Sequence, residues 1–329
     1  MLRISRTLLT LSALAAPALA DIDTPFESPE YNGSAAGTSM AGQQGWYTPN
    51  VAGSIDYTIM TYAGNAFGLP ANPDGAAQFA AGRSLGGTSY ARAQKDHDFS
   101  TSDTWCLSWD FLGRYDGAAP ATHNLGSFSF QPTGTQAAPE SRLFIALNTF
   151  VDLANPTTWS AGYVVHDAAG IQVNQPGIFA GPEWQNLPVD TWFRQTTEIN
   201  LTENRITRVT ITNLATGGTA AAEPAGWYLG GGATPALPLS TSIRFFAGGT
   251  TAGNIAAWDN LRLVPTCGAP PCPGDLDGDA DVDIQDLATL LANFGTPGGA
   301  GADQGDLDGD GDVDLQDLAG LLGAFGSNC

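Results

Sequence analysis

Basic residues are scarce in this sequence of 329 residues. It contains 12 Lys and Arg against 33 Asp and Glu, and its formal net charge at pH 7 is −21. Lys95 is the one lysine. Proteins that bind nucleic acids neutralise phosphates with clusters of basic side chains. The sequence has no such cluster, which argues against a nucleic-acid partner and, for the same reason, against binding to an anionic membrane surface.

Long apolar runs are also missing. Residues 8–16 form an apolar run that is too short to span a bilayer. Arg3 and Arg6 precede this run, and Ala18-Leu19-Ala20 follows it as an A-x-A cleavage signal. We therefore predict that residues 1–20 are a signal peptide. The mature protein is expected to be secreted, extracellular or at the cell surface, without membrane insertion.

Cysteine is rare, with four residues in the chain. An even number in an exported protein indicates disulfide bonds, and four cysteines allow three pairings. We favour Cys272–Cys329, which would join the two ends of the repeat described next, and this leaves Cys106–Cys267. Cys267 and Cys272 can exchange roles in this scheme.

A tandem repeat lies near the C-terminus. Residues 274–295 and 305–326 are identical at 17 of 22 aligned positions, with an offset of 31. Each copy contains a twelve-residue loop with aspartates at positions 1, 3, 5, 7, 9 and 12. They are Asp275, Asp277, Asp279, Asp281, Asp283 and Asp286 in the first loop, and Asp306, Asp308, Asp310, Asp312, Asp314 and Asp317 in the second. This spacing of hard oxygen ligands is typical of a calcium loop and predicts two bound Ca²⁺ ions.

The charge of this segment also favours a bound metal. Residues 267–329 contain 13 Asp and no Lys, Arg or Glu, so no basic side chain within the segment neutralises them. Position 6 of such a loop requires a sharp turn, which Gly311 supplies in the second loop. The first loop has Ala280 there, so we expect its site to be weaker. The alternative interpretation is an acidic, disordered tail.

Apolar residues with helical spacing follow each aspartate set. This regular spacing argues against a disordered tail and predicts a short helix beginning near loop position 10 in each repeat. The predicted stripes are Ile284, Leu287, Leu291 and Phe294 in the first repeat, and Leu315, Leu318, Leu322 and Phe325 in the second. We expect the two stripes to face each other and form a very small core, which calcium binding would help to fold.

With its two Asp-rich loops and a helix after each loop but none before, this segment resembles a type I dockerin. The stretches before the loops, CGAPPCPG and TPGGAGADQG, are too rich in Gly and Pro for helices. In that family, loop positions 10 and 11 help to contact the cohesin receptor and are often small hydroxyl residues. Here they are Ile284-Gln285 and Leu315-Gln316. The resemblance therefore implies a cohesin-like or other surface receptor protein as partner.

The residues between the signal peptide and the repeat predict a β-sandwich. Short runs rich in β-formers alternate with Gly, Pro and Asn turns. The clearest are 54–62, 104–111, 126–131, 142–151, 162–166, 191–200, 206–214, 243–247 and 256–263, with 200–205 as a hairpin loop. The segments Asp190–Phe193, Glu198–Leu201 and Trp258–Leu263 resemble parts of a concanavalin A-like (lectin, laminin G or glucanase) jelly roll.

The expected fold class is therefore mostly β, a jelly-roll sandwich followed by a small all-α dockerin-like module. We assign residues 21–263 to the sandwich, 264–273 to a Pro-rich linker and 274–329 to the calcium-binding module.

Catalytic residues are not evident, and we assign none. A glycosidase requires two carboxyl groups on either side of the scissile bond, but the glutamates before the repeat are isolated in sequence. A carboxylate pair could still assemble from Asp96, Asp98, Asp103 and Asp110. The run 82–86 matches the G-x-S-x-G nucleophile motif but lacks the strand-to-helix context which that motif needs, so we interpret it as a loop.

Eight tryptophans are present, and most are expected in the core. Trp159 and Trp184 lie in polar stretches and are candidates for stacking on sugar rings. The leading hypothesis is a secreted calcium-binding protein whose dockerin-like module docks a glycan-binding or structural sandwich to an extracellular partner. The alternatives are a polysaccharide-degrading enzyme, with O-glycosyl hydrolysis as the expected reaction, and a purely architectural surface protein.

Overall fold

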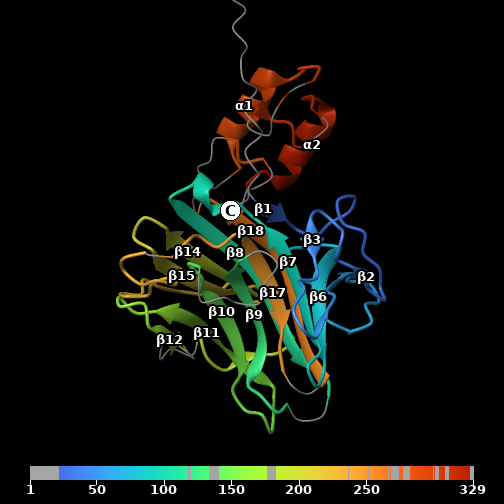
Figure 1. The fold of residues 1–329 in the computed structure, drawn as a ribbon. Coiled ribbons are helices and arrows are strands. Elements are labelled where there is room, and N and C mark those ends of the chain that lie inside the picture. The colour runs from blue at the N-terminus through green and yellow to red at the C-terminus, as the bar shows by residue number, and fades with distance from the viewer. Residues whose placement is uncertain are drawn as a thin grey trace, which may run out of the picture. The chain divides into compact units, whose positions relative to one another are not determined.

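The computed structural model describes most of the chain after the predicted signal peptide, which itself lies outside the described residues. The described ranges are 22–117, 120–132, 141–175, 183–235, 237–249, 252–265, 267, 274–276, 282–298, 300, 304–307 and 311–326. The chain divides into two compact units at Pro265 (Figure 1). We describe each unit separately.

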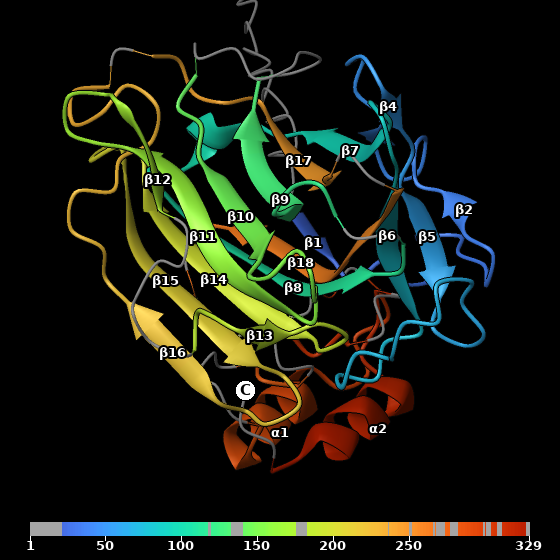
Figure 2. The ribbon, with the colours of Figure 1, turned by 90° about the horizontal axis from the view of Figure 1, so that it is seen from below.

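The first unit is mostly β and contains two sheets, seen as two layers in Figure 2. The first sheet has the order β16 (Thr219–Ala222), β15 (Arg205–Asn213), β14 (Phe193–Asn200), β8 (Thr104–Tyr115), β18 (Ala252–Val264), β6 (Gln78–Leu85), β5 (Thr58–Thr61) and β2 (Thr38–Ser39), and β1 (Ile22–Thr24) pairs with β18. The second has the order β12 (Gln172–Gln175), β11 (Thr158–His166), β10 (Ile145–Phe150), β9 (Asn124–Gln131), β17 (Ser242–Ala247), β7 (Tyr90–Asp96) and β3 (Trp46–Tyr47), with β13 (Leu187–Pro188) beside β11 and β4 (Ser54–Ile55) beside β7. A 3₁₀ turn, Phe99–Thr101, precedes β8.

Nearly all described strand pairs are antiparallel, and many neighbours in a sheet are distant in sequence. Strand β8 lies between β14 and β18, for example, although more than 75 residues separate it from either. This arrangement agrees with the predicted jelly-roll sandwich. Each strand expected from the sequence overlaps an observed strand, and the predicted hairpin loop joins β14 to β15.

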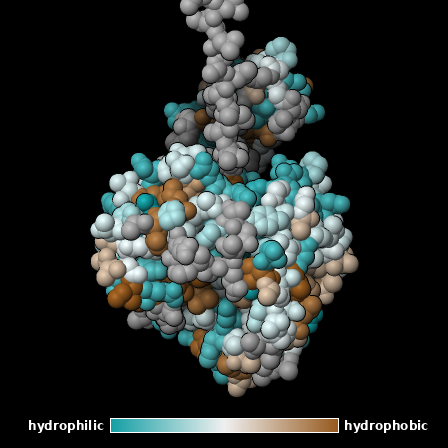
Figure 3. Space-filling model, in the orientation of Figure 1, coloured by the Kyte–Doolittle hydropathy of each residue, from teal (hydrophilic) through white to brown (hydrophobic). Residues whose placement is uncertain are grey.

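Aromatic side chains fill the space between the two sheets. Along β8 and β18 the residues alternate, so that Trp109, Phe111 and Trp258 point into this core. Trp258 stacks on Phe245 of β17 with ring centroids 4.8 Å apart, and Trp109 stacks on Phe128 of β9 at 5.0 Å. Stacked aromatic pairs contribute packing energy beyond the area that they bury. On the face shown in Figure 3, hydrophobic residues occur in separate small groups among hydrophilic ones.

The G-x-S-x-G run is part of strand β6, so its assignment to a loop was wrong. Gly82 allows the strand to lie against the ring of Tyr57, because a Cβ at this position would come within 2.4 Å of that ring. Ser84 is fully buried and donates a hydrogen bond to the Gly249 carbonyl at 3.0 Å. A hairpin to β7, and not a helix, follows the motif, so this serine is a structural residue.

A disulfide joins Cys106 of β8 to Cys267, which lies three residues beyond β18. The register between these strands places Cys106 directly opposite Val264, so the chain needs only a short excursion to reach the sulfur. This pairing agrees with the one favoured from the sequence. Cys272 and Cys329 lie outside the described residues.

The described residues of the second unit form two helices, α1 (Ile284–Asn293) and α2 (Leu315–Ala324), each beginning at the predicted loop position 10. The loop aspartates explain these starting points. Asp283 caps α1 by accepting a hydrogen bond from Gln285 N at 2.6 Å, and Asp286 accepts one in return from Asp283 N at 2.7 Å. This capping box is repeated at α2. No helix within the described ranges combines the length and apolar character needed to cross a bilayer.

The predicted helix stripes were largely wrong. Most of their members are 42–71% exposed; these are Ile284, Leu291, Phe294, Leu315, Leu322 and Phe325. The small core is formed instead by fully buried Leu290 and Leu321 together with Val282 and Val313 from the loops. Leu287 and Leu318 are partly buried against this core, so one residue of each stripe was placed correctly.

The two repeats interlock with approximate twofold symmetry. Gly295, after α1, donates to the carbonyl of Val313 at 2.8 Å, and Gly326, after α2, donates to the carbonyl of Val282 at 2.8 Å. These four positions are related by the repeat offset of 31 residues. Each repeat therefore completes the backbone hydrogen bonding of the other, which explains why the unit is duplicated.

Candidate functional site

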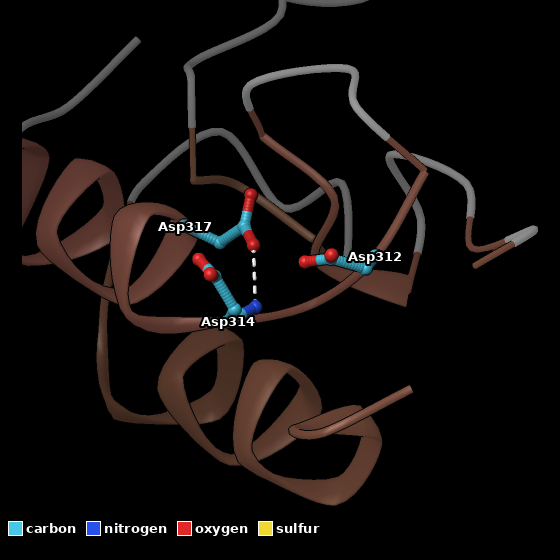
Figure 4. Close-up of side chains that lie close together, drawn as sticks. All are labelled: Asp312, Asp314 and Asp317. Atoms are coloured by element: carbon cyan, nitrogen blue, oxygen red, sulfur yellow. Dashed lines mark hydrogen bonds between the residues drawn. The ribbon is translucent and has the colours of Figure 1, made fainter. Parts of the chain in front are cut away.

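The second acidic loop brings three aspartates together. Carboxylate oxygens of Asp312, Asp314 and Asp317 all lie within 4.8 Å of one another and point into one space (Figure 4). At the start of the loop, Asp306 accepts a hydrogen bond from the backbone N–H of Gly311 at 3.0 Å. Gly311 has φ = +91°, a conformation that favours glycine, as predicted for loop position 6.

The aspartate at position 12 organises both loops in the same way. Asp286 accepts from the backbone N–H groups of Leu276 at 2.6 Å and Asp283 at 2.7 Å. Asp317 accepts from those of Leu307 at 2.8 Å and Asp314 at 2.7 Å. Both carboxylates are almost completely buried. Each of their oxygens accepts one backbone N–H, so the position of both carboxylates is fixed by the backbone of their own loop.

The donor set fits a hard divalent cation. Carboxylate oxygens are the ligands that such ions prefer, and residues 267–329 contain no Lys, Arg or His to neutralise them. Asp275, Asp283 and Asp286 are described in the first loop, and Asp306, Asp312, Asp314 and Asp317 in the second. The other predicted ligands, Asp277, Asp279, Asp281, Asp308 and Asp310, lie outside the described residues, as does Ala280. The described acidic triad can hold a metal ion.

Trp159 and Trp184 do not form a sugar-stacking platform. Trp159 is 0% exposed and packs edge-to-face against Phe111 and Phe193, and Trp184 is 4% exposed. A ring inside the core cannot present its face to a ligand. All eight tryptophans are at most 8% exposed, so the polar sequence around these two reflected neighbours that point outward.

A pocket of about 500 Å³ is lined in part by Glu183, the residue before Trp184. It is lined by Glu183, Asn186, Leu187, Pro188, Phe193, Ile211, Asn213, Gly218 and Thr219. Apolar side chains from β13, β14 and β15 are joined there by amide, hydroxyl and carboxylate groups. Such a mixture is usual in sites for small polar ligands. No pattern in the sequence predicts that these residues line a pocket.

The carboxylate pair that could have assembled from Asp96, Asp98, Asp103 and Asp110 finds no support in their contacts. Asp96 accepts a hydrogen bond from the Tyr47 hydroxyl at 2.7 Å, and Asp98 caps the 3₁₀ turn. Asp110 lies instead directly opposite Asp259, its neighbour across β8 and β18. Both carboxyl groups are 0% exposed. They lie on the outer face of the first sheet, because the adjacent Trp109 and Trp258 occupy the inner face.

A buried hydrogen-bond network surrounds this pair. Arg194 of β14 donates to both oxygens of Asp110, from Nε at 2.7 Å and from Nη2 at 3.0 Å. Asp259 accepts from the Tyr62 hydroxyl at 2.6 Å and from the backbone N–H of Asn260 at 2.9 Å. Asn72 donates to both carboxylates, at 2.8 Å and 3.3 Å. We call Tyr62, Asn72, Asp110, Arg194, Asp259 and Asn260 the acid-pair network.

The two acids in this network have different partners. Burial raises the pKa of Asp259 well above its usual value, and the charges of Asp74 and Asp110 add to this, while the hydrogen bond from Tyr62 opposes it. Two ionised carboxylates directly opposite each other would repel, and Arg194, the arginine of this network, is paired with Asp110. A protonated Asp259 beside the ion pair of Asp110 and Arg194 satisfies both constraints. Their complete burial makes this network structural and gives it no access to a polymer substrate.

His97 is buried against two aromatic rings, and this predicts an acid-sensitive step in stability. Its ring lies 4.7 Å from those of Phe99 and Trp105, and burial lowers its pKa to about 4, with Asp98 opposing and Lys95 assisting. Between pH 6.5 and about 4, the His97 imidazole therefore binds a proton in the unfolded chain but not in the folded chain. The contribution of neutral His97 to the free energy of unfolding is complete above pH 6.5. It is lost as the pH falls, and the total loss is about 3 kcal/mol.

Urea unfolding between pH 4 and 7 measures this loss through tryptophan fluorescence. His97→Gln is expected to flatten the pH dependence in this window relative to the unaltered protein. Asp259 has a raised pKa, so its contribution lowers the stability as the pH rises above 3.8, opposite to the effect of His97. The effect of His97 is therefore best measured in an Asp259→Asn background. An unchanged slope in the His97 variant would contradict the assignment.

Comparisons with known proteins found no matching family model and no matching curated protein. Among solved structures, an alginate lyase from Aplysia kurodai is 12% identical with a TM-score of 0.38, covering 59% of this chain and 85% of its own. Lectin II from Ulex europaeus is 10% identical with a TM-score of 0.38, covering 70% and 95%. Basic winged bean lectin is 12% identical with a TM-score of 0.37, covering 67% and 94%. At this level of likeness, ligand and activity must be inferred from the side chains of this chain.

Proposed function

We propose that this protein is an exported calcium-binding protein in which a dockerin-like module docks a glycan-binding β-sandwich to an extracellular receptor. The observation that carries the proposal is the duplicated acidic loop, in which a buried aspartate at position 12 is held by two backbone N–H groups in each repeat. Repetition of the same hydrogen bonds in both loops supports two sites of the same kind.

Calcium is the ion that this donor set favours. The loops supply up to six carboxylates each and contain no sulfur or imidazole ligand, and calcium accepts six to eight oxygens in flexible geometry. The bound ion would neutralise the charge that otherwise opposes folding. Asp312, Asp314 and Asp317 would hold it in the second loop, with Asp306 from the loop start.

Docking is supported by the exposed apolar faces of the two helices. Ile284 and Leu291 on α1, and Leu315 and Leu322 on α2, are all more than half exposed. Exposed apolar groups gathered on one small unit typically mark a protein-binding surface. We propose a cohesin-like or other surface receptor with a complementary apolar face as the occupant. Because the two helices are equivalent, either could make the contact.

Glycan binding by the sandwich is supported by the pocket beside β13. Its polar groups, among them Asn186, Asn213 and Thr219, are arranged around an apolar floor that includes Phe193 and Ile211. Hydroxyl-rich ligands with apolar ring faces match such a lining. The alternative is an enzyme that cleaves polysaccharides, or an architectural domain without a ligand.

Calorimetric titration of the full chain with Ca²⁺, followed by a glycan array in saturating Ca²⁺, tests the proposal. We expect two binding events and retention on at least one glycan without chain cleavage. New reducing or unsaturated ends in a polysaccharide panel would instead establish the enzymatic alternative. Absence of calcium binding would refute the docking module.

Gly311→Ala is expected to weaken the second calcium site. A side chain at φ = +91° costs about 1–2 kcal/mol, which corresponds to roughly 5- to 30-fold in affinity. Gly320→Ala is the matched control, because a Cβ there would make only an ordinary contact, 3.8 Å from Leu307. An affinity unchanged by Gly311→Ala in the calorimeter would argue against its role in the loop turn.

A further inference from the structure

The pocket beside β13, which we call the side pocket, is lined by strands of both sheets. Leu187 and Pro188 form β13, which pairs with β11 of the second sheet. Phe193, Ile211 and Thr219 come from β14, β15 and β16, the three strands at one edge of the first sheet. These strands can be followed in Figure 2. The side pocket therefore lies at one edge of the sandwich, between the two sheets.

The side pocket has an apolar floor and a polar rim. The floor consists of core side chains that are at most 4% exposed: Leu187, Phe193 and Ile211. The rim consists of polar residues that are exposed or half-buried: Glu183, Asn186, Asn213 and Thr219. The rim is therefore accessible to a dissolved ligand, and the floor offers an apolar surface to the part of the ligand that enters.

The rim contains polar groups that are free to bind a ligand. Asn213 Oδ1 accepts a hydrogen bond from the backbone N–H of Ala215 at 2.9 Å, which fixes the amide and leaves its Nδ2 as a donor. The Glu183 carboxylate and the Asn186 amide form no hydrogen bond or ion pair with the described part of the chain. The Thr219 hydroxyl, by contrast, is hydrogen-bonded to that of Thr212 at 2.8 Å. One amide donor, one whole amide and one carboxylate are thus available.

The charge of the side pocket is negative. Glu183 is the one charged residue among the described lining residues. Residues 176–182, which precede it and lie outside the described residues, contain no charged side chain in the sequence. Arg194 of β14 and Arg208 of β15 are already in ion pairs with acidic side chains. An anionic ligand would therefore meet an uncompensated carboxylate, whereas a cationic group would pair with it.

We propose that the side pocket binds an amino sugar, whose protonated amine contacts the Glu183 carboxylate. This inference rests on the proposed glycan-binding function and names the class of glycan. Hydroxyl groups of the sugar would bond to the amides of Asn186 and Asn213, since an amide both donates and accepts. The apolar face of the sugar ring would lie on the floor of the pocket. A hydrogen bond between ammonium and carboxylate is charge-assisted, so it is stronger than one from a neutral hydroxyl.

Titration calorimetry with the full chain at saturating Ca²⁺ tests the proposal. The probes are oligomers of one length and linkage in their amino, neutral and uronic forms, prepared in both the glucose and the galactose series. Slightly acidic buffer keeps the sugar amines protonated. We expect the amino form of at least one series to bind about tenfold more tightly than its neutral form, as for a hydrogen bond to a charged group. The uronic form should bind more weakly than the neutral form.

Glu183→Gln is expected to remove most of this preference, because the amide keeps the shape of the side chain but not its charge. Glu183→Lys should reverse the order, so that the uronic form binds more tightly than the amino form. Glu223→Gln is the charge-matched control, because Glu223 directly follows β16 and is exposed but is not among the described lining residues. It should change binding by less than about twofold. Both positions are exposed, so the variants should fold.

Equal affinity for the amino and neutral forms in both series, or an amino preference that survives Glu183→Gln, would overturn the inference while leaving glycan binding intact. Retention on the glycan array of glycans without amino sugars alone would do the same. A simple alkylamine that binds as tightly as the amino oligomer would overturn the assignment to a sugar. Absence of binding to any glycan would refute the proposed glycan-binding function together with this inference.

Discussion

Asp110→Asn is expected to destabilise the sandwich by about 3–5 kcal/mol, because it breaks a buried ion pair from one side. Asp110 is 0% exposed and receives two hydrogen bonds from Arg194. An asparagine offers one acceptor and places N–H donors against the guanidinium. Arg194 then keeps its charge on a partly buried face without a carboxylate partner.

Asp259→Asn is the matched control for this prediction. The two acids are directly opposite each other and equally buried, but an amide resembles the protonated acid that we infer at Asp259. The loss should therefore be clearly smaller than for Asp110→Asn. Because the pKa of Asp259 is raised in the folded state, the folded protein retains a proton that the unfolded chain releases above pH 3.8. The stability of the unaltered protein relative to this variant should decline as the pH rises from there.

Urea unfolding followed by tryptophan fluorescence measures both effects. All eight tryptophans precede residue 259, so the signal reports on the sandwich and not on the helical unit. Equal losses for the two variants would contradict the assignment of the ion pair to Asp110. A difference between Asp259→Asn and the unaltered protein that does not change with pH would contradict the protonation of Asp259.

Asp317→Asn is expected to abolish the second calcium site and unfold much of the helical unit. The change removes charge from a ligand and disturbs two backbone hydrogen bonds, including one of the capping box of α2. Metal binding and folding are coupled in a unit with so small a core. We therefore expect at least about 100-fold weaker binding at this site and a smaller helical signal at 222 nm.

Two further variants serve as comparisons in this experiment. Asp286→Asn makes the equivalent change in the first repeat and should have a similar effect there, since its hydrogen bonds are the same. Asp303→Asn removes one negative charge outside both twelve-residue loops and should leave both sites unchanged. If Asp317→Asn still bound two calcium ions with the original affinities, the ligand assignment would be wrong.

The repeat unit shows how far spacing alone can predict structure. Aspartate spacing located the loops and the starts of both helices, because the same carboxylates cap the helices. The buried face was misassigned because leucines occur in pairs, Leu290-Leu291 and Leu321-Leu322. Either member of a pair satisfies a helical pattern, and only packing of the other repeat selects Leu290 and Leu321.

In the sandwich, strands were predictable but long-range partners were not. Runs rich in β-formers between turn residues located β9 and β14, whereas β6 was missed because its Ala and Gly residues resemble a loop. Asp110 and Asp259 are separated by 149 positions, and no local sequence pattern predicts that their strands pair. Arg92 and Arg244 likewise become neighbours only through the register of β7 and β17.

The Cys106–Cys267 disulfide determines how the sandwich would carry mechanical load. Tension applied to the chain beyond residue 267 would reach β8 through the disulfide before it could pull β18 away from β8, beginning at Val264. Strand β8 is hydrogen-bonded along its length to β14 on one side and β18 on the other. Extraction would have to shear both ladders together. Under reducing conditions the same pull would act directly on the end of β18, which is itself paired with β8 and β6.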